Sequence, residues 1–240
     1  MLALVLLMYL VAAPASAQEP TAHQQHGSHD GMSMPTDDGS TAALLAEKRG
    51  SEFNHHLAGF LVALAGVFIL FQPGLAKKWP ATKYAWPTCF LLSGVFLLVW
   101  SDTELWPFGD TAWLEALKHD PEVLQHKTFA VLLLVLGTVE WQRARGVLNA
   151  AWKGWVFPAL AIGGSVLLLF HQHDAGTHGP HDMELMARIQ SQHLSFALVG
   201  IGVGLTKALS EAETSWQRVF RTAWPSLMMT LGILLMFYQE

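Results

Sequence analysis

The sequence predicts an all-α polytopic membrane protein with six transmembrane helices, arranged as three repeated helical hairpins with both termini on the periplasmic side. Three observations predict this fold: few charges, long apolar blocks, and markers that recur three times at fixed spacing. Of the 240 residues, 52% are hydrophobic and 14% are charged, whereas soluble domains carry about 25% charged residues. The apolar blocks are long enough to cross a hydrocarbon core of about 30 Å as helices. We therefore expect one six-helix transmembrane domain over residues 51–240.

The repeat is defined by a histidine, a glycine and an aromatic–proline pair. Each of three apolar runs opens with an amide residue and a histidine, and a glycine follows at the same distance in every run. An aromatic residue and a proline then open a second apolar run. A fixed period with matching punctuation is typical of an internal repeat. The repeats, about 54–102, 125–173 and 192–240, carry Asn54-His55, Gly66 and Trp86-Pro87; Gln125-His126, Gly137 and Phe157-Pro158; and Gln192-His193, Gly204 and Trp224-Pro225.

The first 50 residues are expected to lie outside the membrane domain. Residues 1–17 have the apolar core and the small-residue cleavage site, Ala15-Ser16-Ala17, of a secretory signal peptide. Residues 18–50 predict a flexible periplasmic tail, because no apolar periodicity would order them. Histidine and methionine side chains suit copper ions, so metal capture is favoured over a plain linker. The candidate tail ligands are His23, His26, His29, Met32 and Met34.

The distribution of charge orients the helices. Lysine and arginine gather in the short loops on one side, which the positive-inside rule assigns to the cytoplasm. The histidine face then points towards the periplasm from the bacterial inner (plasma) membrane, in agreement with the signal peptide. The net charge of −5 offers nothing basic enough for nucleic acid. The expected spans are about 54–71, 84–100, 126–141, 154–171, 193–209 and 222–238, with a surface helix near 111–118.

The histidines carry the strongest functional signal, since all twelve fall outside the membrane or at its outer boundary in this topology. Three hairpins closed around a pseudo-threefold axis would bring His55, His126 and His193 to one depth. Three imidazoles suit zinc or copper and leave a coordination position open. The alternative is that each histidine is an interfacial residue bonded to a loop carbonyl, although ionisable groups inside membrane spans are costly and usually functional. Further candidate ligands are His171, His173, Asp102, Glu240 and His56, the last about 100° round the helix from His55 and so not expected on the same ion.

Other reactive groups have simpler interpretations. Glu140 lies beside Arg143, which favours a helix-end ion pair over a proton relay. Cys89 is the only cysteine, so no internal disulfide forms, and we expect a buried small side chain. The sequence has no Gly-x-Ser-x-Gly elbow, no His-Glu-x-x-His and no phosphate loop, which disfavours a hydrolase. A three-histidine metal with an open position could still activate water.

The exported tail and the histidines together resemble the bacterial copper-resistance D family and related multi-histidine inner-membrane proteins of copper handling. The features that carry the resemblance are Asn54-His55-His56, Gln125-His126 and Gln192-His193, together with Leu-Phe-His-Gln-His at 169–173. The resemblance implies copper binding at the periplasmic face and transfer across or along the membrane. It also makes a periplasmic copper carrier a candidate partner, beside the lipid bilayer.

Two other functions stay open. A single-haem membrane redox protein is one, since two histidines on neighbouring helices can ligate haem iron from both faces. A structural subunit of a larger membrane complex, with incidental histidines, is the other. Copper is the expected metal, with zinc or haem as alternatives.

Overall fold

The computed structural model describes residues 38–239, except 149–150, 171–179 and 213–214. The predicted signal peptide, 1–17, and the tail up to residue 37, with its five candidate metal ligands, lie outside the described residues. From Asp38 onward the predicted tail is helical, because the first described helix, α2, begins there. Helix α2 therefore starts well before its apolar run.

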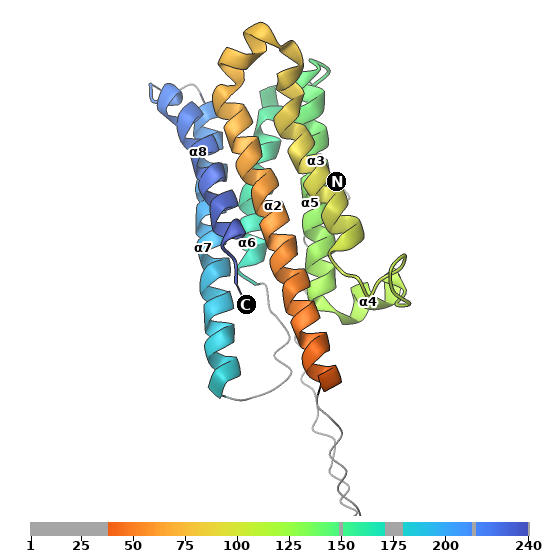
Figure 1. Cartoon of the computed structure of the whole chain (residues 1–240). Helices are drawn as coiled ribbons and strands as arrows, with labels where there is room; N and C mark the ends of the chain where they lie inside the picture. Colours follow the sequence, from red (N-terminus) through yellow and green to blue (C-terminus); the bar gives the residue numbers. More distant parts are fainter. Residues whose placement is uncertain (1–37, 149–150, 171–179, 213–214, 240) are drawn as a thin grey trace, which may run out of the picture. The chain divides into compact units, whose positions relative to one another are not determined.

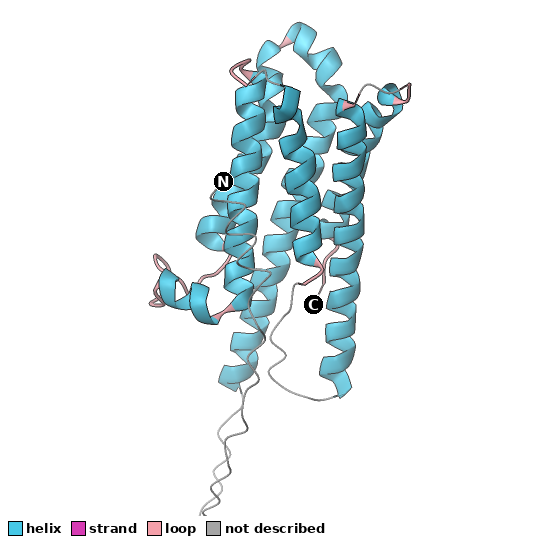
Figure 2. Cartoon of the chain, turned by 180° about the vertical axis from the view of Figure 1, so that it is seen from behind, coloured by secondary structure: helices cyan, strands magenta, loops and turns pink. Residues whose placement is uncertain are grey.

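The fold is all-α, as predicted (Figures 1 and 2). In the described part of the chain, seven α-helices are joined by short connections, two of which contain the 3₁₀ helices η1 and η2. The predicted surface helix near 111–118 is present as the short helix α4. The elements are α2 (Asp38–Lys78), η1 (Pro80–Tyr84), α3 (Ala85–Trp100), α4 (Trp113–His119), α5 (Pro121–Ala144), η2 (Ala151–Trp155), α6 (Val156–Leu168), α7 (Pro180–Glu211) and α8 (Gln217–Met236).

Five described segments are long and apolar enough to cross a membrane, which makes the chain a polytopic membrane protein in contact with a lipid bilayer. The sixth expected span, 154–171, corresponds to α6, a shorter apolar helix of 13 residues. Its helical geometry ends two residues before the undescribed stretch 171–179. The five long segments are Lys48–Lys78, Pro80–Trp100, Pro121–Ala144, Glu184–Glu211 and Gln217–Met236.

The six longer helices lie side by side in a bundle (Figures 1 and 2), and their contacts form a closed ring. Going round it, α2 packs on α3, α3 on α5, α5 on α6, α6 on α7, α7 on α8, and α8 back on α2. The pair α5 and α6 makes the sparsest contact of these neighbours, and α4 packs on α5 outside the ring. The first and last helices of the described residues, α2 and α8, are therefore neighbours, and α5 lies across the ring from α8.

The start of α5 is fixed by a capped turn. Asp120 accepts hydrogen bonds from the backbone N–H groups of Glu122 and Val123, at 2.9 and 3.1 Å. Pro121 occupies the first helical position, where its missing N–H removes no helical bond. This cap sets the position of His126, little more than one turn further on.

Three glycines allow close approach between neighbouring ring helices: α2 and α8, α5 and α3, and α7 and α6. Gly66, Gly137 and Gly204 each face the residue four positions after the proline that opens a second apolar run. Small residues at such contacts let membrane helices pack by van der Waals attraction. An added Cβ would lie 2.6 Å from Met229 at Gly66, 2.8 Å from Leu91 at Gly137, and 2.5 Å from Ile162 at Gly204.

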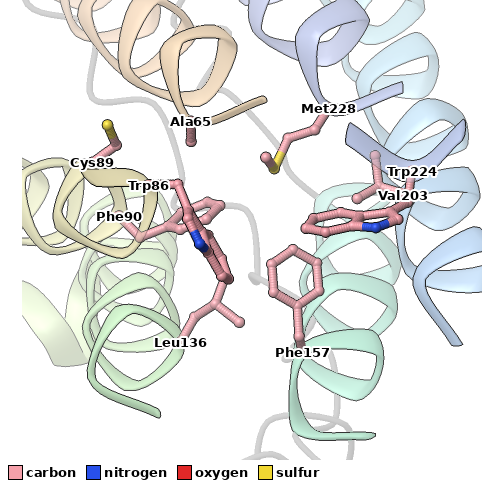
Figure 3. Close-up of a cluster of buried hydrophobic side chains, with 9 residues drawn as sticks. All are labelled: Ala65, Trp86, Cys89, Phe90, Leu136, Phe157, Val203, Trp224 and Met228. Atoms are coloured by element: carbon pink, nitrogen blue, oxygen red, sulfur yellow. The ribbon is translucent and has the colours of Figure 1, made fainter. Parts of the chain in front are cut away.

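The core is closed by three aromatic side chains from three helices. The rings of Trp86, Phe157 and Trp224 meet with centroid separations of 5.3 to 6.3 Å (Figure 3). Their tilted and edge-to-face arrangement is the favourable one for aromatic pairs. Cys89 is buried in the same cluster, as expected from the sequence.

Charged side chains on α5 and α7 form a network at the end of the bundle next to these aromatic rings. Arg143 donates to Glu140 at 2.8 Å, which confirms the predicted ion pair, and lies 3.4 Å from Glu211. Lys207 also pairs with Glu211, and its ammonium lies 4.7 Å from the centre of the Trp224 ring. Two acids and two bases thus tie α5 to α7 without a net charge.

Candidate functional site

A cavity of about 250 Å³ lies inside the ring and is lined by residues of all six ring helices. Its wall includes Phe90 and Phe157 of the aromatic core, so the core closes one end of it. Nearly all lining residues are apolar. The exceptions with polar side chains are Asn54, His55, His126, Ser165 and His193.

His55 on α2 and His193 on α7 are adjacent. Their ring centroids lie 5.8 Å apart at an interplanar angle of 81°. Each Nδ1 donates a hydrogen bond of 2.9 Å to the carbonyl one turn earlier, of Ser51 and Ile189 respectively. A carbonyl can only accept, so the proton is on Nδ1 and the lone pair of each neutral ring is on Nε2.

The side chain of Tyr238 packs against both His55 and His193. Its buried ring stacks on His55 with centroids 3.9 Å apart, and lies 5.7 Å from the ring of His193. Its carbonyl accepts a hydrogen bond of 3.0 Å from Nε2 of His56. This bond holds the segment after α8 against α2. The partner of His56 is thus a backbone carbonyl and not the imidazole of His55.

His126 on α5 is oriented by a carboxylate. Its Nδ1 donates to Asp102 at 2.8 Å, while the other oxygen of Asp102 pairs with Lys127 at 2.6 Å. The Ser101 hydroxyl also donates to Asp102. Burial alone would raise the pKa of Asp102, but the hydrogen bonds from His126, Lys127 and Ser101 outweigh it and hold that pKa below its ordinary value. The carboxyl is therefore ionised at neutral pH.

The amide residue before each of His55, His126 and His193 binds a backbone carbonyl just after the end of the next ring helix. This contact ties the histidine-bearing helix to the carboxyl-terminal end of the next ring helix, near the cavity. The side-chain amide donates to a carbonyl in each case: Asn54 to Ser101 at 3.0 Å, Gln125 to Phe170 at 3.2 Å, and Gln192 to Gln239 at 2.8 Å.

The structure brings His55, His126 and His193 to one cavity but does not arrange them as a coordination shell. His55 and His193 share a ring contact, whereas His126 borders the cavity from α5 and is held by Asp102. Within residues 38–239, as far as they are described, no group of three or more His, Cys, Asp or Glu side chains is arranged to hold a metal ion. The predicted ligands His171, His173 and Glu240 lie outside the described residues.

Sequence reasoning missed Tyr238 and Lys127. Tyr238 is the last residue of the expected span 222–238, and nothing in its spacing indicates that it stacks on His55. By sequence Lys127 is one of the few positive charges at the outer ends of the expected spans, yet its side chain is 6% exposed. A lysine inside an apolar run, with an aspartate closing the preceding run, was the available signal for this pair.

The fold and the site define a class of protein: a polytopic α-helical membrane protein with an apolar central cavity bordered by three histidines from three helices. Comparison with protein-family models, with curated proteins and with solved structures gives no match for this chain. Function is therefore inferred from the site's geometry.

Proposed function

We propose that this protein binds copper at the histidine-bearing end of its cavity and serves in copper handling or transport at the inner membrane, with that end facing the periplasm. One observation carries the proposal: His55, His126 and His193 come from three different helices and border the same cavity. Imidazole is a good ligand for copper, and zinc is the alternative ion for the same donors.

The orientation of the imidazoles supports metal binding. Histidines that bind metals usually donate their other ring N–H to a carboxylate or a backbone carbonyl, which fixes the tautomer. Here the Nδ1 groups of His55 and His193 donate to carbonyls, and that of His126 donates to the carboxylate of Asp102. Ligand nitrogens sit about 2 Å from such an ion, and a centroid separation of 5.8 Å is compatible with two imidazoles that bind the same ion.

Equivalent contacts in the three hairpins support the proposed repeat of six spans. Each repeat glycine faces the residue four positions after a repeat proline, always in the hairpin that precedes it round the ring. Each repeat amide donates to a carbonyl at or near the end of its own hairpin. Three such hairpins around a pseudo-threefold axis would each direct one histidine towards that axis.

The test is an anaerobic Cu(I) titration of the purified full chain against a chromophoric chelator. The triple variant His55→Ala/His126→Ala/His193→Ala should lose about one copper per chain relative to the wild type. The variant His119→Ala is the matched control, because His119 lies exposed on α4. All variants keep residues 18–50, so any copper bound by that segment cancels in the comparison.

Equal copper content in the wild type and the triple variant would refute the proposal. Zinc is titrated in parallel, and tighter zinc than copper binding would reassign the metal. A visible spectrum is recorded on the same samples. A Soret band that is lost in the triple variant would identify haem rather than copper as the ligand of these histidines.

A further inference from the structure

The central cavity is long and narrow. On α5 its lining extends from His126 to Leu136, and on α7 it extends from His193 to Val203. In each helix these two residues are ten positions apart, which is about 15 Å at a rise of about 1.5 Å per residue. The volume is only about 250 Å³, whereas a cavity of about 150 Å³ is needed to take up benzene alone. Spread over this length, the space suits a slender chain of about ten carbon atoms better than a broad ring system.

The walls of the cavity between its two ends are almost entirely apolar. Phenylalanine, leucine, valine and alanine side chains form most of the lining, and the Ser165 hydroxyl donates to the carbonyl of Ala161 at 2.7 Å. Among the described residues that line the cavity, none is a lysine, arginine, aspartate or glutamate. An unfilled apolar space deprives its walls of dispersion contacts, whereas a charged headgroup would lose its hydration there without gaining a counter-ion. The lining therefore fits a hydrocarbon chain and not the polar end of a lipid.

The seam between α5 and α6 gives such a chain a way in from the bilayer. These helices make the sparsest contact between neighbours in the ring. At the three repeat glycines an added Cβ would meet the backbone of the neighbouring helix at 2.8 to 3.1 Å. At Gly164 on α6 it would meet only the side-chain ends of Leu132 and Phe129, at 3.5 and 3.6 Å, and both of these side chains also line the cavity. Because side chains rather than packed backbone close this seam, a lipid chain can pass between the two helices when they change rotamer.

We propose that this cavity binds one unbranched acyl chain of a glycerophospholipid from the surrounding bilayer. The chain enters between α5 and α6, past Leu132 and Phe129, and the headgroup stays outside the ring. The juxtaposition of a long apolar cavity with a seam that only side chains close carries the proposal. A phospholipid fits better than a free fatty acid, because its polar end need not enter a cavity without fixed charges. The site uses none of the imidazole nitrogens proposed for copper, and it does not depend on copper binding.

The test is native mass spectrometry of the full chain in detergent, delipidated and then titrated with dipalmitoylphosphatidylcholine. The variant Ala161→Phe fills the cavity from α6, and Ala159→Phe is its matched control on the same helix, at an exposed residue outside the cavity lining. The wild type and Ala159→Phe should each bind one phospholipid with the same affinity. Ala161→Phe should bind it at least about tenfold more weakly. Equal affinity of Ala161→Phe and the wild type would mean that the lipid chain is not in the cavity.

Two further ligands test the chemistry of the occupant. Diphytanoylphosphatidylcholine has the same headgroup but methyl-branched chains, which are too wide for a slender cavity, so it should bind at least about tenfold more weakly to the wild type. Equal binding of the two phospholipids would contradict a site for an unbranched chain. Palmitate carries the matching chain on a free carboxylate and should leave the phospholipid bound at equal concentration. Full displacement by palmitate would assign the cavity to free fatty acids instead.

A measurement on the wild type decides the question if thermal unfolding shows that Ala161→Phe is misfolded. Phosphatidylcholine with a diazirine in the middle of its acyl chain is irradiated with the protein in liposomes, and the labelled residues are identified by mass spectrometry of peptides. Attachment to Leu133 and Leu160, which line the cavity, supports the proposal. Attachment only to outward residues such as Val131 and Leu198, which are 50% and 60% exposed, would overturn it.

Discussion

Replacing Asp102 by asparagine tests how the histidine end of the bundle is held together. The Asp102 side chain is 4% exposed and that of Lys127 is 6% exposed. Asp102→Asn keeps the shape of the side chain but removes the charge that faces Lys127 at 2.6 Å and His126 at 2.8 Å. The ammonium group of Lys127 is then left buried without a counter-ion.

The magnitude follows from the burial of the pair. Removing one partner of a buried ion pair costs about 3–5 kcal/mol, because the other charge is left uncompensated. Lys127 keeps hydrogen bonds to the Ser101 hydroxyl at 3.2 Å and to the Leu97 carbonyl at 3.3 Å. We therefore expect the lower end of that range, a loss of about 3 kcal/mol in the free energy of unfolding.

The assay is unfolding by sodium dodecyl sulfate in mixed micelles, followed by tryptophan fluorescence, on a double-mutant cycle with Lys127→Met. Replacing a whole buried pair by apolar groups is often close to neutral. The double variant should therefore be about 2 kcal/mol more stable than Asp102→Asn alone. A loss below about 1 kcal/mol for Asp102→Asn, or simple additivity in the cycle, would refute the buried pair as an energetic unit.

Three further outcomes follow from the same contacts. The pKa of Asp102 is lower in the folded protein, so the unfolded state binds the proton first as the pH falls. The free energy of unfolding should therefore fall as the pH drops below about 4. Asp102→Asn should flatten this pH dependence, measured by thermal unfolding from about pH 6 to 3. Gly232→Val should lower the midpoint of thermal unfolding strongly, because its Cβ would meet the α2 backbone. The control Gly163→Val places its side chain in open space and should leave the midpoint unchanged. Equal midpoints for the two variants would exclude the close contact between α8 and α2 at Gly232. Glu140→Gln should cost about 2 kcal/mol, because Arg143 keeps a second carboxylate; an unchanged unfolding curve would make the network irrelevant to stability.

The helices show what apolar patterning can and cannot predict. The span 84–100 agrees closely with α3, Ala85–Trp100, because Trp86-Pro87 marks its start and Ser101-Asp102 its end. Helix α2 extends far beyond the predicted 54–71, since backbone hydrogen bonds continue through polar residues where the apolar run has stopped. An apolar run indicates which part of a helix lipid can surround, and capping residues indicate where the helix ends.

The candidate site also has a part that the sequence predicts and a part that it does not. Regular spacing predicted that His55, His126 and His193 belong together, and all three border one cavity. Whether they share an ion stays a prediction. The pairing of Asp102 with His126, and the stacking of Tyr238 on His55, join segments that are distant in sequence and depend on side-chain rotamers. The cavity could not be predicted either, because unfilled volume is a property of packing that no residue encodes alone.

Closure of the ring by α8 has a consequence for biosynthesis. Helix α8 is synthesised after the other five ring helices, and it supplies the wall between α2 and α7. Without α8 the other five ring helices would form an open arc, and their inner face, with its imidazoles, would lack its cover between α2 and α7. The compartment at the centre is therefore closed only when α8 is in place, and a chain stalled before α8 would lack that wall of the cavity.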